Sequence, residues 1–184
     1  MYPDARVLHQ ALFRALKSAL ALTASEADKF LIRAYSDVPA PEPPPSANVC
    51  YYFLQTDPTA PLPQEERTVS NQAEVFSFLP VRINLVFYGE ACEAWAHHVR
   101  SFFFLDGDSQ PRKILREAGL YPIPKPRPPA ILYEELAKVF RKRADLVIEA
   151  RLADTAVQSS VTTGKAVKIP TIRQAPSVTV HVPA

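Results

Sequence analysis

An α+β domain is the fold class that this sequence predicts, because helix-period and strand-period segments both occur along it. Residues 4–21 carry apolar side chains at three-and-four spacing, and Asp4 is placed to cap the helix that they predict. Residues 81–88 and 143–152 alternate apolar and polar side chains, which is the period of a strand with one buried face. One domain of ordinary size can bury a core built from these segments.

Short elements and stiff connectors are expected between the first helix and the central strand. Ser25, followed by acidic residues, indicates a second helix start, and residues 30–35 fit a short buried strand, so we expect a helical turn that leads into a strand. Residues 38–45 are rich in proline, which lacks an amide donor and fixes φ, and they predict an extended connector. Residues 48–54 read as a strand, and residues 55–72 as a long polar excursion.

The middle of the chain predicts a strand followed by helices. Residues 75–88 form the strand, Gly89 ends it, and residues 90–103 show helical spacing. Residues 108–111 resemble a helix cap with an early proline, and they predict a short helix at 112–118.

The C-terminal part of the sequence predicts an arm that follows the α+β domain. Residues 121–129 predict a second proline-rich connector, and residues 131–140 are ambiguous between helix and strand. We place an α+β domain at 1–155 and a basic C-terminal arm at 156–184. The arm carries Lys165, Lys168 and Arg173, and alternating valines at its end predict a terminal strand at 178–182.

Composition argues against several classes of protein. Among 184 residues the formal net charge is only +2, so no global field favours nucleic acid or an anionic membrane. The segment at the N-terminus lacks the features of a signal peptide, and no window is long and apolar enough for a membrane span. Cys50 and Cys92 have no metal or redox spacing, and we expect two buried thiols in a reducing compartment. Proline occurs 19 times and glycine 4 times, which predicts stiff loops suited to docking.

The helix predicted at 90–103 carries the candidate residues for a catalytic or metal site. Glu93 and His97 lie one helical turn apart, with His98 beside them, but no third ligand lies nearby in the sequence. Cys92 and His97 are five residues apart and point to different faces, which argues against a nucleophile and its base. We therefore expect Glu93 and His97 to be an ordinary exposed pair, and we expect no enzyme, cofactor or metal.

Three further motifs favour ordinary structural roles. Residues 106–108 resemble the opening of a calcium loop but lack its closing glutamate, and residues 163–165 lack the first glycine of a phosphate loop. The proline tract at 39–45 could dock an aromatic groove, although a stiff connector is the preferred interpretation.

The densest basic cluster is a candidate electrostatic contact. Arg141, Lys142 and Arg143 could meet DNA or an acidic partner ring. The preferred interpretation is a solvated strand edge that resists edge-to-edge aggregation.

Four local segments stand out along the chain: residues 30–41 (FLIRAYSDVPAP), 81–91 (VRINLVFYGEA), 115–127 (LREAGLYPIPKPR) and 142–152 (KRADLVIEARL). Together with the order of elements, they resemble the phage neck terminator family, whose members cap the tail tube of contractile-tailed phages and related prophages. The resemblance spans roughly residues 5–155 and its motifs are structural patterns. The tract at 39–45 and the tail after residue 155 depart from the family.

The resemblance implies a tail-terminator-like subunit in which a mixed or antiparallel sheet is flanked by helices on one face. It implies a ring, a hexamer, on the end of the tail tube, which stops tube polymerisation and offers a surface to the head connector. Its partners are other copies of itself, the tail tube protein, the head–tail connector and sheath proteins, with DNA passing through unread. The protein is then expected in the virion, after assembly in the bacterial host cytoplasm. A head-completion or baseplate component is the alternative, followed by a small enzyme with an unrecognised site.

Overall fold

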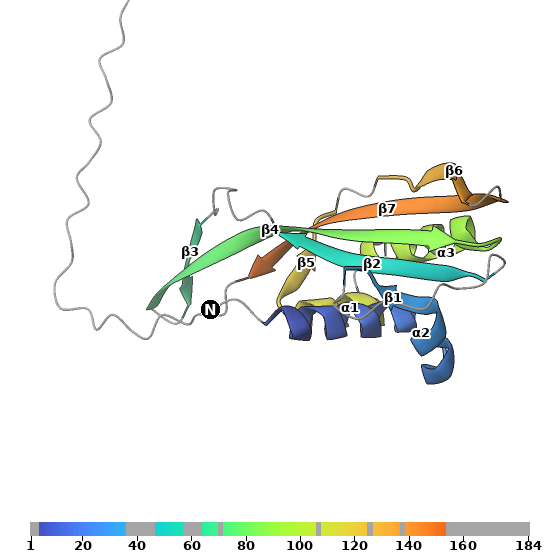
Figure 1. Cartoon of the computed structure of the whole chain (residues 1–184). Coiled ribbons are helices and arrows are strands. Elements are labelled where there is room, and N and C mark those ends of the chain that lie inside the picture. The colour runs from blue at the N-terminus through green and yellow to red at the C-terminus, as the bar shows by residue number, and fades with distance from the viewer. Residues whose placement is uncertain are drawn as a thin grey trace, which may run out of the picture.

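The computed structural model describes residues 4–35, 47–56, 64–69, 72–105, 108–124, 127–136 and 139–153. In this part of the chain a β-sheet carries helices on one of its faces (Figure 1). The architecture confirms the predicted α+β class. None of the helices described is long and apolar enough to cross a membrane.

Helix α1 (Ala5–Ala19) begins where the sequence predicts. The Asp4 carboxylate accepts a hydrogen bond from the Arg6 backbone N–H at 2.9 Å, which satisfies one of the free donors of the first turn. The apolar stripe of α1 joins the core beneath the sheet through Leu8, Ala11, Leu12, Ala15, Leu16 and Ala19.

Helix α2 (Ala24–Phe30) leads directly into strand β1 (Leu31–Arg33), as expected for this segment. Its cap differs from the prediction, because Thr23 is the N-cap and Ser25 lies inside the helix. Thr23 accepts a hydrogen bond from the Glu26 backbone N–H, and the Glu26 carboxylate accepts one from the Thr23 N–H, which makes a capping box.

The centre of the sheet consists of β2 (Val49–Thr56), β4 (Gln72–Tyr88) and β7 (Val139–Ala153), paired antiparallel in that order. The edge strand β1 lies parallel to β2, so the sheet is mixed. The strands expected at 48–54, 75–88 and 143–152 are therefore confirmed, and each extends beyond its predicted bounds.

Three strands correct the sequence-based expectation. β3 (Gln64–Val69) lies in the predicted excursion and pairs with the first part of β4, which extends away from the helices (Figure 1). β5 (Leu120–Pro122) includes the first residues of the second proline-rich connector and pairs with the end of β7. β6 (Ala130–Leu136) makes the ambiguous segment a strand, which pairs with the start of β7.

Helix α3 (Cys92–Arg100) follows β4 after a tight turn at Gly89, whose φ is +99°. The first helical residues lack a side-chain cap of their own, since Ala91 holds the N-cap position. The Asn48 side chain supplies the missing acceptor from the other side of the turn, with its Oδ1 2.9 Å from the Ala91 nitrogen.

A π-helical turn (Ser101–Leu105) extends α3, and α4 (Gln110–Glu117) follows it. Ser109 is the N-cap of α4 and Pro111 lies in its first turn, as the sequence indicates. The Ser109 hydroxyl donates to the Phe102 carbonyl and so ties the start of α4 to the π-helical turn.

The helix-bearing face of the sheet holds the core. Because side chains alternate along a strand, every second residue from Val81 to Phe87 of β4 and from Ala144 to Ala150 of β7 points toward the helices and is almost fully buried. These residues are Val81, Ile83, Leu85, Phe87, Ala144, Leu146, Ile148 and Ala150. The residues between them point away from the helices and form the second face of the sheet.

Candidate interaction surface

The second face of the sheet has no described helix over it and spans β2, β4 and β7. We call it the open face. Register places Arg82 opposite Glu149, Asn84 opposite Val147, and Val86 opposite Asp145, so charged, polar and apolar side chains mix across it. Val147 is 42% exposed in the middle of β7, where the helix-facing neighbours are fully buried. An apolar side chain exposed at the centre of a sheet marks a surface that another protein can cover.

Aromatic pairs form one part of the open face. Tyr51 packs edge-on against Tyr88 at 5.8 Å between ring centroids, and Tyr35 packs edge-on against Phe53 at 5.1 Å. Tyr35 is 87% exposed and has a φ of +56°, a region that bulky residues seldom adopt. The backbone strain thus coincides with a tyrosine ring that is presented to solvent.

A polar network fixes the side chains around Tyr88. Its hydroxyl donates to Glu134 at 2.8 Å, and burial together with this bond raises the pKa of Tyr88 to about 12. Arg143 binds both carboxylate oxygens of Asp145, at 2.6 and 2.8 Å, and lies 3.4 Å from Glu134. The hydrogen bond to Asp145 is the main reason that the pKa of Arg143 is raised. This end of the open face is therefore preorganised, which lowers the entropic cost of binding a partner.

The predicted basic cluster is divided between the two faces of the sheet. Lys142 points to the helix-bearing face, where its Nζ lies 2.7 Å from Glu93 of α3. Arg143 points to the open face and is paired there with carboxylates. β6 pairs with one side of this part of β7 and places Glu134 beside Arg141, whereas the pairing of β4 with the other side of β7 begins only at Arg143. The charges of Lys142 and Arg143 are each paired with carboxylates within the chain. The strand-edge interpretation stays a prediction.

The catalytic candidates on α3 lie apart from one another. Cys92 is fully buried, whereas His97 is exposed on the other side of the helix. The main partner of Glu93 is Lys142, whose hydrogen bond lowers the pKa of the Glu93 carboxyl; the proximity of His97 contributes less. Within the described residues, no group of three or more His, Cys, Asp or Glu side chains could hold a metal ion. Cys50 is also buried, so both thiols are placed as expected.

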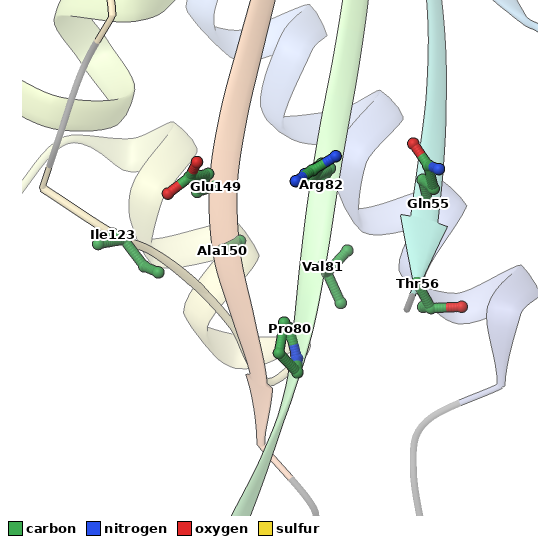
Figure 2. Close-up of a pocket in the computed structure, with 8 residues that line it drawn as sticks. All are labelled: Gln55, Thr56, Pro80, Val81, Arg82, Ile123, Glu149 and Ala150. Carbon is green, nitrogen blue, oxygen red and sulfur yellow. The ribbon is translucent and has the colours of Figure 1, made fainter. Parts of the chain in front are cut away.

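A hollow of about 520 Å³ lies where β2 ends on the sheet (Figure 2). Gln55, Arg82 and Glu149 line it, together with Ile123 after β5. Glu149 is also 3.7 Å from the guanidinium of Arg127. The hollow is open and mixed in polarity, so we interpret it as a shallow depression of the open face and not as an enclosed ligand site.

Several sequence candidates lie outside the described residues. These are the basic residues Lys165, Lys168 and Arg173 of the arm, the terminal strand at 178–182, the proline tract at 39–45 and the phosphate-loop resemblance at 163–165. Of the calcium-loop resemblance, only Asp108 is described.

The open-face residues were not singled out from the sequence as a site. The strand alternation does contain an indication of this surface, because the residues between the buried ones include Tyr51, Phe53, Tyr88 and Val147. A polar face reads as ordinary solvent exposure, and only the pairing of strands brings the aromatic residues together.

Comparisons with known proteins give structural similarities but no family. No protein-family model matches the chain, and no curated protein matches it. A chain in the solved structure "Virion of native gene transfer agent (GTA) particle" is 13% identical and has a TM-score of 0.26. The match covers 80% of this chain and 98% of that chain. At this TM-score the similarity supports no argument about function.

Proposed function

We propose that this protein is a structural virion component that caps a phage tail tube as a ring and stops tube polymerisation. It then forms the neck surface that joins the tail to the head connector. The observation that carries the proposal is the open face, a preorganised surface of mixed polarity on a sheet whose other face is already covered. The four segments that resemble the neck terminator family give the proposal its specific form.

The physical basis is area buried between neighbouring proteins. A sheet face over which the described residues place no helix offers area that another molecule can bury. The two lateral edges of the sheet differ, being β1 on one side and β5 and β6 on the other, so a contact that joins one edge to the other is heterologous. Heterologous contacts form rings when the rotation closes, and the proposed ring is a hexamer.

The proposed partners follow from that role. They are other copies of the chain, the tail tube protein, the head–tail connector and sheath proteins, with DNA passing through the ring without sequence-specific contacts. The protein acts in the virion after assembly in the host cytoplasm, and the proposal assigns it no catalytic step and no cofactor.

Tube growth in vitro tests the proposal. Purified protein is added to polymerising tail tube protein, and tube length and tube ends are measured in negative-stain images. We expect growth to stop at substoichiometric amounts with density at one tube end. Val147→Glu on the open face should weaken this effect, whereas Ala94→Glu, exposed on α3, should retain it.

Two outcomes would contradict the proposal. Unchanged tube growth in the presence of wild-type protein would remove the capping role and favour a head-completion or baseplate component. Capping by wild-type protein that Val147→Glu does not alter would leave the role but remove the open face from it.

A further inference from the structure

A second hollow lies on the helix-bearing side of the sheet, at the β1 edge. It has a volume of about 480 Å³ and lies between α1 and the strands β1 and β2. Its lining consists of Arg6, His9, Gln10, Phe13, Arg14, Arg33 and Tyr52. We call these seven residues the arginine pocket.

Three arginines from two elements line this pocket. Arg6 and Arg14 lie two turns apart on α1, and Arg33 comes from the edge strand β1. No carboxylate is among the described residues that line it. The rim of the pocket is therefore strongly cationic, although the chain as a whole carries a net charge of only +2.

The floor of the arginine pocket is aromatic. Tyr52 is 5% exposed, and its ring lies 6.3 Å from that of His9 between centroids. Nδ1 of His9 is buried with no hydrogen-bond partner among the described residues, and burial, aided by Arg33, lowers the pKa of the imidazole. An aromatic floor under a cationic rim fits an aromatic side chain that is accompanied by a carboxylate.

The opposite edge of the sheet presents that combination. Tyr133 on β6 is 72% exposed and Phe140 on β7 is 73% exposed. Register pairs Glu135 with Phe140 and Tyr133 with Lys142, so Tyr133, Glu135 and Phe140 share one face. Lys142 contacts α3, which identifies this face as the helix-bearing one. We call Tyr133, Glu135 and Phe140 the aromatic edge.

The two features occupy the positions that a head-to-tail contact requires. Both lie on the helix-bearing side, and they flank opposite edges of the same sheet, with β1 at one end of the strand order and β6 at the other. Two aromatic rings exposed at a strand edge are a liability unless a partner covers them.

We propose that the aromatic edge of one copy of this chain docks in the arginine pocket of the next copy. The aromatic rings pack on the floor formed by Phe13 and Tyr52, and the Glu135 carboxylate meets the guanidinium groups of the rim. The inference rests on the proposed self-assembly and assigns the surfaces that carry it. Because pocket and edge are different surfaces, each subunit uses both, and the contact propagates from copy to copy.

Complementation between two broken variants tests this pairing. One variant, Arg6→Glu with Arg14→Glu, loses the pocket and keeps the aromatic edge. The other, Glu135→Lys with Phe140→Asp, loses the edge and keeps the pocket. A control, Lys113→Glu with Arg116→Glu, makes the same change of charge as the first variant on α4, away from the pocket. Solution mass is measured by light scattering over a concentration series, and circular dichroism confirms that each variant is folded.

The expected result is specific to a head-to-tail contact. Wild type and control assemble, whereas each broken variant alone needs at least about a tenfold higher concentration to do so. A 1:1 mixture of the two broken variants gives a species of two chains and no larger, since only one intact pocket and one intact edge remain to meet.

Three results would overturn the inference. If both folded broken variants assemble like wild type, other surfaces carry the contact while self-assembly itself stands. If the mixture stays monomeric while wild type assembles, pocket and edge are not partners. If wild type is monomeric throughout, the contact does not form in solution, and the proposed capping function is then judged separately by the tube-growth experiment.

Discussion

Replacing Gly89 by alanine should destabilise the protein by about 2–3 kcal/mol, because the turn before α3 has neither the backbone freedom nor the space for a side chain. At a φ of +99°, an alanine is strained by about 1–2 kcal/mol. An added Cβ would lie 2.4 Å from the Asn48 Oδ1 and 2.8 Å from the Ala47 carbonyl oxygen. Asn48 must move, and its hydrogen bond from the Ala91 N–H is then lost, at about 1 kcal/mol.

Urea unfolding of four proteins checks this reasoning: wild type, Gly89→Ala, Asn48→Ala and the double variant. Asn48→Ala alone should cost about 1 kcal/mol, since it removes the acceptor at the start of α3. The double variant should be more stable than the sum of the two effects predicts, by about 1 kcal/mol, because both changes lose the same bond. A cost below about 1 kcal/mol for Gly89→Ala, or strict additivity of the two changes, would refute the account of the turn.

Three further predictions concern ionisable groups. The folded pKa of His9 lies below its ordinary value of 6.5, lowered by burial and by Arg33, so the unfolded chain binds the proton first. This group's contribution to stability is full above about pH 6.5 and decreases as the pH falls toward the folded pKa, and His9→Gln should flatten that part of the pH profile of unfolding. Arg143→Met should lower the free energy of unfolding, measured in urea, by about 1–3 kcal/mol, because the Asp145 carboxylate loses its bidentate partner. Lys142→Met removes a more exposed ion pair and should lower it measurably less. Equal losses would contradict the network around Arg143. Cys50 is fully buried and its thiol pKa is raised, so a disulfide reagent should label it only after denaturant is added, and rapid labelling in the native state would contradict its placement.

The elements that could be predicted from the sequence are those with one buried face. The helix at 4–21 and the strands at 75–88 and 143–152 bury alternating or three-and-four-spaced side chains, and this burial is what the periodicity reports. Their local pattern and their tertiary environment agree, so the pattern was sufficient.

The strands that were missed owe their structure to distant partners. β3 has the sequence Gln-Glu-Glu-Arg-Thr-Val, without an alternating apolar set, and it is a strand because it pairs with the first part of β4. β6 combines good helix formers with an alternating pattern, and pairing with β7 decides between them. Non-local pairing of this kind overrides local propensity and leaves little trace in the sequence.

The basic cluster shows why a site could not be inferred from adjacency. Neighbouring residues on a strand point to opposite faces, so Lys142 and Arg143 never act together. The arginines that do line one pocket, Arg6, Arg14 and Arg33, come from a helix and an edge strand and show no motif in the sequence. The proposed contact between subunit edges leaves no trace in the sequence for two reasons: folding assembles each surface, and a second copy would complete the contact. This is the reason that the complementation of two broken variants, rather than any single substitution, is the decisive measurement.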